Sequence, residues 1–335
     1  MTALERVRVA SVYIGAIVGA GFATGKEIIL FFGDGGYLAP LVTGAAMGLC
    51  ASLFLCVGKL GAQLKNEGKL GGRAISIAKI VFYGIIEICM LLTMTTMTGG
   101  MQNIFGWTQT GRLTGFLIAL LCVAFSSAGA KAVGRINLAL VPVLFVLLAL
   151  LFFKSSKCVE PLPFDTLKSA NYLSMNMLLG GCLTVKDGER AKGKDIAAIG
   201  IVCAVVLSAM TFFVYVAASD YPRSDMPIYS LCRACGLGAL GAVTTGIAIL
   251  TTLAGAAKSL GDGIYALVPS KTAVTSALLL LTLASYGWDF AEAVNLFYPF
   301  IAAIASGVFA LAFAALAVYA LSRRIKKFPY ARKKE

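Results

Sequence analysis

Ten segments of mainly apolar residues follow one another along the chain, and a bilayer-crossing helix needs about 20 such residues. Because the bilayer core holds no water to bond free backbone groups, a lipid-exposed span is a helix or part of a closed barrel. The runs are continuous rather than alternating, which indicates helices. We therefore expect an all-α polytopic membrane protein of about ten transmembrane helices, forming one domain over residues 1–335. The segments are Val7–Phe32, Gly36–Gly58, Ala74–Thr98, Leu113–Ala130, Ile136–Phe153, Ser169–Val185, Ile196–Ser219, Leu237–Ala257, Thr272–Gly287 and Ala293–Leu321.

The composition excludes several other classes of protein. Hydrophobic residues make up 59% of the chain and charged residues 13%, whereas soluble proteins have about 45–50% apolar and about 25% charged residues. The absence of histidine removes the commonest general base and metal ligand. No phosphate-binding G-x-x-x-x-G-K-[ST] run occurs either. We expect a protein that is not an enzyme, binds no cofactor tightly and does not use ATP.

The charge distribution predicts the orientation in the membrane. If the first helix enters from the cytoplasm, most of the 29 Lys and Arg residues fall in the inner loops, as the positive-inside rule requires. Both termini are then cytoplasmic, and the basic residues give no reason to expect a nucleic-acid partner. Aromatic residues near the predicted outer ends are expected to anchor the helices at the interface. They are Tyr37, Trp107, Tyr221, Trp288 and Tyr298.

Glycines interrupt the first and the sixth predicted helices. The first contains Gly15, Gly19, Gly21 and Gly25, spaced by two as well as by four, and the sixth contains Gly180-Gly181. In each helix the weak point lies about 18 Å from the end at which the chain enters the membrane. We therefore expect both helices to break near the midplane. Small-residue packing between helices is the alternative explanation of these glycines.

The ten segments also divide into two halves, at about residues 7–153 and 169–321. Five helices start from inside and five from outside, which is an inverted repeat in topology. Glycine-interrupted helices at matching positions of two halves point to the binding site of a transporter. A broken helix exposes N–H groups that favour a carboxylate and carbonyl groups that suit Na⁺.

The stretch from Ser11 to Gly15, together with Gly25-Lys26-Glu27, resembles the N-terminus of the YkvI-like bacterial membrane proteins. Those proteins belong to the amino acid–polyamine–organocation group of transporters, which has the LeuT fold. The resemblance implies a five-plus-five inverted repeat of LeuT type, alternating access and a small, amino-acid-like substrate. It also implies a multi-pass protein of the bacterial inner membrane.

The resemblance further implies two sets of site residues. A sodium site would use the carbonyls of Gly15, Val18 and Ala248 and the hydroxyls of Thr251 and Thr252. The hydroxyls could instead bond only their own helix. The implied substrate site has a carboxylate on the N–H groups of Ala20 and Gly21. The substrate set also contains Glu87, which departs from the family's pattern. In full it is Gly19, Ala20, Gly21, Phe22, Tyr83, Glu87, Asn176, Gly180 and Gly181.

Two acidic residues fall within the predicted spans. Glu87 lies mid-span in the third helix, where a charge is costly, and should face the interior. It could bind a substrate amine, carry a coupled proton, pair with a cation or serve a structural role. Glu27 is expected only to complement the dipole of the outer half-helix.

We predict a secondary transporter of a small amino acid or related amine, with Na⁺ as the coupling ion. Related proton-coupled transporters carry a lysine in the fifth helix, and 136–153 contains none, which favours Na⁺ over H⁺. A proton-coupled or uncoupled facilitator or exchanger is an alternative, as is an amino-acid-binding sensor subunit. The expected partners are a small-molecule substrate and the lipid bilayer.

Overall fold

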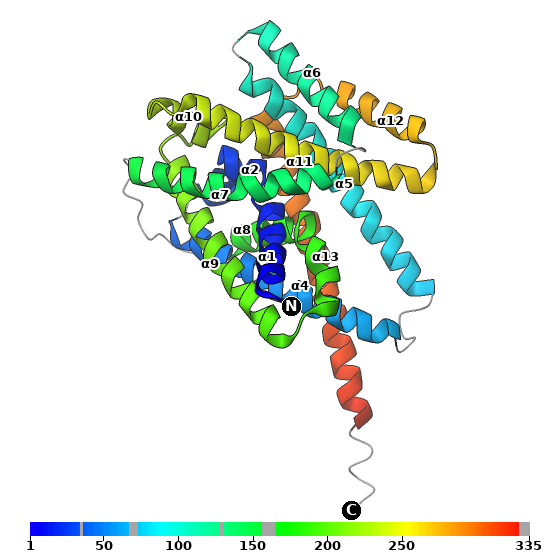
Figure 1. Ribbon diagram of the computed structural model, residues 1–335. Helices are drawn as coiled ribbons and strands as arrows, with labels where there is room; N and C mark the ends of the chain where they lie inside the picture. The colour runs from blue at the N-terminus through cyan, green and yellow to red at the C-terminus, as the bar shows by residue number, and fades with distance from the viewer. Residues whose placement is uncertain (34–35, 67–72, 107, 127–129, 156–164, 328–335) are drawn as a thin grey trace, which may run out of the picture.

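The computed structural model describes residues 1–33, 36–66, 73–106, 108–126, 130–155 and 165–327, and these ranges are almost entirely helical (Figure 1). The first half contains α1 (Ala3–Ile17), α2 (Ala20–Thr24), α3 (Lys26–Phe32), α4 (Leu38–Asn66), α5 (Arg73–Ile104), α6 (Gln109–Phe125) and α7 (Ala130–Lys154). The second half contains α8 (Thr166–Leu179), the 3₁₀ helix η2 (Gly181–Arg190), α9 (Gly193–Ala218), α10 (Pro227–Ala234), α11 (Gly238–Leu267), α12 (Lys271–Ala284) and α13 (Phe290–Lys327). Trp107, one of the expected interface anchors, lies outside the described residues.

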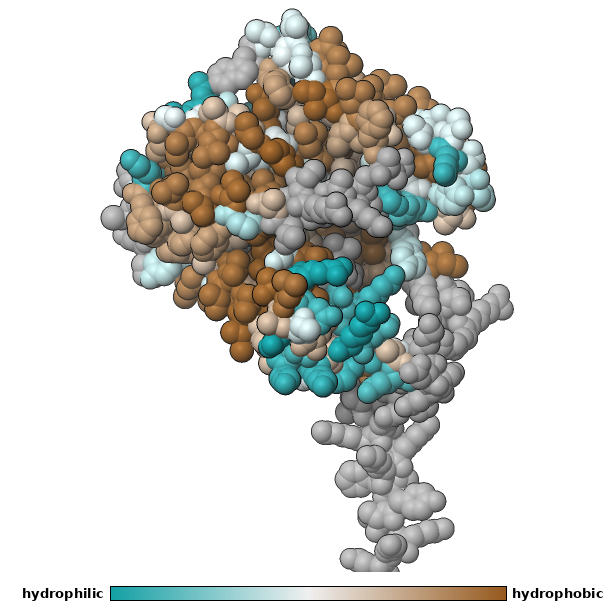
Figure 2. Space-filling view, viewed as in Figure 1, coloured by the Kyte–Doolittle hydropathy of each residue, from teal (hydrophilic) through white to brown (hydrophobic). Residues whose placement is uncertain are grey.

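Five helices are long and apolar enough to cross a membrane. Their apolar parts are Leu38–Gln63 of α4, Ile80–Ile104 of α5, Gly193–Ala218 of α9, Gly238–Leu267 of α11 and Phe290–Ala312 of α13. Shorter apolar helices occupy three further predicted segments, at Gln109–Phe125, Ala139–Lys154 and Lys271–Ala284. Figure 2 shows hydrophobic residues over much of one face, with hydrophilic residues gathered near the start of α1. The chain is a multi-pass helical membrane protein, and its ten crossings stay a prediction.

The two remaining segments, the first and the sixth, contain the expected breaks. Val18 and Gly19 separate α1 from α2, and Gly25 separates α2 from α3. Gly25 has a φ of 74°, a left-handed conformation that glycine adopts without strain. The sixth segment ends as an α-helix at Leu179 and continues from Gly181 as η2. The glycines that predicted the breaks therefore mark them in the structure.

Glycines on α4 let this helix pack closely against α9. A Cβ atom on Gly44 would lie 2.7 Å from the carbonyl oxygen of Leu207, and one on Gly48 would overlap the backbone of Ala204. Small residues four apart on one face allow membrane helices to approach in this way. The hydroxyl of Ser52 on α4 adds a hydrogen bond of 2.9 Å to a carbonyl of α9. The contact is therefore made by backbone as much as by side chains.

Several helix contacts made by the first half have a counterpart made by the second half. The second predicted segment of each half packs against its counterpart, α4 on α9, and the third predicted segments pack likewise, α5 on α11. α7, the last helix of the first half, contacts α1, α11 and α9, while α13, the last of the second half, contacts α8, α5 and α3, so the contacts with α1, α11, α8 and α5 correspond between the halves. Two halves related by a pseudo-two-fold axis would give this pattern.

The close approach of α4 and α9 predicts a position-dependent effect of added methyl groups. Gly48→Ala should destabilise the protein, by about 1–3 kcal/mol for an overpacked contact, because the new Cβ meets backbone that cannot rotate away. Gly61→Ala on the same helix is the matched control, since nothing lies within 4 Å of a Cβ there. Thermal melting of the detergent-purified proteins measures the difference. Equal melting temperatures for the two variants would contradict the close packing.

Candidate functional site

The first break leaves backbone carbonyls without helical partners. α1 ends at Ile17, and the N–H of Gly19 turns back to the carbonyl of Ile17 at 2.9 Å. In a continuous helix this N–H would donate to the carbonyl of Gly15, and that hydrogen bond is not made. Within the described part of the chain, three carbonyls here accept no hydrogen bond, those of Gly15, Ala16 and Val18. Buried carbonyls without a donor are costly unless a ligand or ion binds them.

The same break leaves N–H groups free on α2. Among the described residues, the N–H groups of Gly21 and Phe22 make no hydrogen bond. The N–H of Ala20 is occupied, because it donates to the hydroxyl of Thr252 at 3.2 Å. Ala20 was expected to bind a substrate carboxylate together with Gly21. In this arrangement only the N–H of Gly21 is free for that role.

α11 meets the first break through Thr252. Besides accepting from Ala20, the Thr252 hydroxyl donates to the carbonyl of Ala248 at 2.9 Å, and Thr251 donates to the same carbonyl at 3.0 Å. A Cβ atom on Gly19 would lie 2.9 Å from the Thr252 hydroxyl. The structure therefore brings the predicted ion ligands of α11 next to the break that follows the predicted ligands of α1. The bonds to Ala248 are also those expected of threonines that bond only their own helix.

The second break packs directly against the first. A Cβ atom on Gly180 would lie 2.8 Å from the carbonyl oxygen of Ala16, one of the free carbonyls of α1. At Gly181 a Cβ would overlap the ring of Phe54 on α4. Both glycines therefore sit where backbone approaches another helix closely. Gly180 therefore lies beside Ala16, just before the first break, whereas Gly181 lies against α4.

A buried carboxyl lies at the first break, where the sequence suggested only a helix-dipole role. Glu27 is 6% exposed and accepts a hydrogen bond of 2.9 Å from the hydroxyl of Tyr172 on α8. Its carboxyl fills the space that a Cβ on Gly21 would need. The amide of Asn176, another predicted substrate residue, donates to the carbonyl of Tyr172 at 3.0 Å. The signal that could have found Glu27 is its charge within an apolar span, since such charges are rare and usually functional.

Tyr298 is placed differently from its expected position at the membrane interface. It is 4% exposed, and its ring lies within electrostatic range of Glu27. Two other expected anchors, Tyr221 and Trp288, are 38% and 37% exposed. Tyr298 is therefore buried in the protein interior rather than exposed at the surface.

Glu87 lies apart from the two breaks, between α5 and α11. The hydroxyl of Ser259 donates to one carboxyl oxygen at 3.4 Å, and the carboxyl also rests against Gly263. Its other oxygen is buried with no partner among the described residues. Ser259 is seven residues beyond Thr252, or about 10 Å along α11. Tyr83 does not join the site, because its side chain is 62% exposed.

Further polar contacts hold the start of α3, next to Glu27. The ammonium group of Lys26 donates to the carbonyl of Ser224 at 3.2 Å, so it points away from Glu27. Asp225, beside Ser224, lies in the loop between α9 and α10. Partial burial raises the pKa of Asp225, the negative charge of Asp289 raises it further, and Lys26 opposes the shift.

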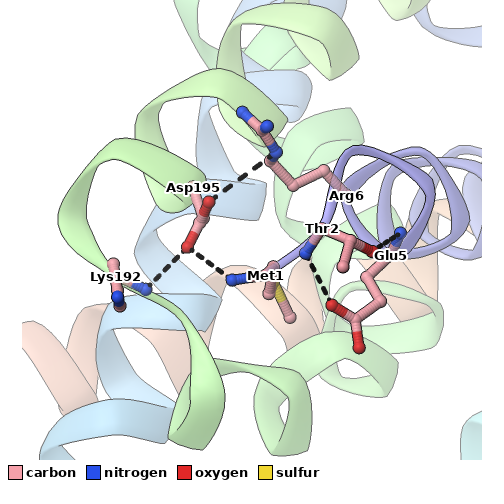
Figure 3. Close-up of polar contacts among 6 residues, drawn as sticks. All are labelled: Met1, Thr2, Glu5, Arg6, Lys192 and Asp195. Atoms are coloured by element: carbon pink, nitrogen blue, oxygen red, sulfur yellow. Dashed lines mark hydrogen bonds and ion pairs between the residues drawn. The ribbon is translucent and has the colours of Figure 1, made fainter.

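A second polar cluster holds the start of α1 against the start of α9 (Figure 3). The carboxyl of Asp195 is completely buried. It accepts from the α-ammonium of Met1 at 3.2 Å and from the backbone N–H of Lys192 at 3.1 Å, and Arg6 lies 3.7 Å away. A cavity of about 170 Å³ adjoins this cluster. It is lined by Met1, Glu5, Arg8, Val9, Asp187 and Arg190.

The chemistry of the site follows from its oxygen atoms. In the described ranges, no three Cys, Asp or Glu side chains come together as a metal site. The oxygens at the first break are carbonyls, threonine hydroxyls and one carboxyl, and these are ligands for hard cations and ammonium groups. These oxygens are therefore suited to a positively charged ligand.

Two comparisons with known proteins bear on this chain. No protein-family model matches it. The chain is 25% identical over 308 residues to an uncharacterized membrane protein, YkvI, of Bacillus subtilis (strain 168), covering 82% of this chain and 85% of the relative. That similarity supports placing the chain with YkvI-like membrane proteins, in agreement with its multi-pass helical fold.

Proposed function

We propose that the protein is a secondary transporter of a small amino acid or related amine that works by alternating access. One observation carries this proposal: the breaks of the first and sixth segments lie against each other, with Gly180 beside the free carbonyl of Ala16. Non-helical backbone deep in a membrane protein is tolerated where it is buried in protein or lines a water-filled cavity. Broken helices at matching positions of two halves are typical of transporter sites.

The exchange of helix contacts between the halves supports the same proposal. The last helix of each half packs against the broken segment of the same half: α7 contacts α1, and α13 contacts α8. A five-plus-five inverted repeat of LeuT type predicts such pairs. Alternating access then amounts to rocking one set of helices against another around a fixed site. The proposal includes residence in a bacterial inner membrane with both termini in the cytoplasm.

Na⁺ is the coupling ion that we propose. Support comes from Thr252, which joins α11 to the first break, and from the shared carbonyl of Ala248. Together with the free carbonyls of Gly15 and Val18, these oxygens form the kind of ligand set that a hard cation prefers. An ion between α1 and α11 would link substrate binding to the relative position of these helices.

Proton coupling through Glu87 is the second candidate mechanism. The observation in its favour is the buried carboxyl oxygen that has no hydrogen-bond partner within the described residues. A neutral carboxyl donates one hydrogen bond, whereas a charged one only accepts. The neighbouring charged groups are Lys258 and Asp262, which pair with each other on α11.

The sodium assignment predicts the behaviour of a double variant. Thr251→Val with Thr252→Val should abolish the rise in melting temperature that Na⁺ gives over choline at equal ionic strength, because a ligand of the folded state stabilises it by mass action. Thr282→Val is the control, since Thr282 is buried and bonds its own helix at 2.8 Å on α12. Sodium stabilisation that persists in the folded double variant would argue against this site. Uptake without any ion dependence would instead indicate a facilitator or exchanger, and binding without uptake a sensor.

Proton coupling predicts a change in the pH profile of uptake. Glu87→Gln keeps the size of the side chain but cannot bind or release a proton. If Glu87 carries the coupled proton, uptake into proteoliposomes driven by a pH gradient should fall to the level seen without a gradient. Binding of the solute at a fixed pH should change little. An unchanged pH profile would assign Glu87 a structural role.

A further inference from the structure

We propose, building on the transport function above, that Glu27 binds the positively charged ammonium group of the transported solute. Tyr172 is then a positioning residue that holds the Glu27 carboxyl beside the first break. This assigns the site to solutes that carry a free amine. It also reverses the expected polarity at Gly21, where a substrate carboxylate was predicted.

The burial and bonding of Glu27 carry the first step. The side chain is 94% removed from solvent, and its single hydrogen-bond partner in the described part of the chain is the neutral hydroxyl of Tyr172. The nearest basic residue in sequence, Lys26, bonds the carbonyl of Ser224 instead. A buried carboxylate with one neutral donor is strongly disfavoured, and an arriving cation would stabilise it.

The position of Tyr172 is fixed by aromatic packing. Its ring lies 5.3 Å from that of Phe31 and 5.1 Å from that of Phe32, both on α3, the helix that carries Glu27. Tyr172 itself is completely buried. Such a ring has little freedom, so its hydroxyl holds the carboxyl in one place. A charged group held in a fixed geometry binds its ligand without an ordering cost.

The first break supplies the remaining acceptors. An ammonium group has three N–H donors and therefore needs more than one acceptor. The carboxyl of Glu27 rests on Gly21, and the free carbonyls of Ala16 and Val18 belong to the same break. Carboxylate and carbonyl oxygens together can satisfy an ammonium group, and they would repel a second carboxylate.

The occupied N–H of Ala20 also favours a cationic ligand at this break. Thr252 accepts the Ala20 N–H, so half of the predicted carboxylate site is already used. The carboxyl of Glu27 covers the side of Gly21. Both facts favour a cationic group over an anionic one at this break. Any carboxylate of the solute would then be bound away from Gly21.

Ligand-induced stabilisation of the purified full-length protein tests the inference. The probes are the common free amino acids, the amines formed by their decarboxylation, and N-acetyl amino acids, each added in NaCl at pH 7. At least one probe with a free amine should raise the melting temperature of the wild type, and its N-acetyl counterpart should not. Glu27→Gln should weaken that binding by at least about tenfold, as expected when the partner of a buried charge is removed.

Further variants guard against a folding defect. Tyr172→Phe keeps the carboxyl and should weaken binding less than Glu27→Gln, because it removes only the positioning hydroxyl. Glu292→Gln is the matched control, an exposed acid in the first turn of α13 that should bind like the wild type. Monodisperse gel filtration shows which variants are folded. If Glu27→Gln does not fold, the comparison of Tyr172→Phe with Glu292→Gln decides the matter.

Three results would overturn the inference. They are equal binding of amines by the wild type and Glu27→Gln, equal binding of N-acetyl and free compounds, and no stabilisation by any amine. Uptake into proteoliposomes distinguishes failure of the Glu27 assignment from failure of the proposed transport function. Transport of a solute without a free amine would leave the transporter standing and remove Glu27 from recognition. Amine binding through Glu27 without uptake would leave Glu27 in recognition of the amine and argue against the transport function.

Discussion

In a lipid environment each backbone N–H and C=O group needs a partner within the protein, and the rest of this structure depends on that requirement. Long helices meet it for most of the chain. Where the chain departs from helix, at Val18-Gly19 and at Gly180, the exposed backbone is packed against other protein rather than against lipid. The two departures face each other. A single constraint therefore accounts for both the helical fold and the concentration of free polar groups in one place.

Glycine has two separate roles in this protein. On α4, Gly44 and Gly48 remain helical and bring the backbone of α9 within contact distance. At the breaks, Gly19 and Gly25 take up backbone conformations that end or restart a helix. The first role produces a closely packed pair of helices, and the second divides one segment into three short helices. A transporter needs both, because one set of helices must move relative to another.

The sequence predicted much of the fold because apolar length and glycine position act locally. It identified the all-helical membrane fold and both breaks, whereas the choice of Thr252 as an ion ligand came from the family resemblance and stays a prediction. The sequence predicted less well which side chains of a helix face a neighbouring helix, because this depends on how the helices are rotated relative to each other. Tyr83 and Glu87 are one helical turn apart, yet Tyr83 points outward while Glu87 contacts α11. Glu27 was assigned to the helix dipole because its contact with Tyr172, 145 residues further along the chain, depends on tertiary packing that no local pattern predicts.

The free N–H groups of Gly21 and Phe22 have a consequence for how water reaches the centre of the protein. Amide hydrogens in a membrane helix usually exchange with solvent only when their hydrogen bonds open. These two make no such bond among the described residues, and Phe22 is completely buried. Their exchange with deuterium is therefore controlled by the arrival of water and not by unfolding. Slow exchange at these two positions corresponds to a sealed centre, and fast exchange corresponds to a pathway open to one side.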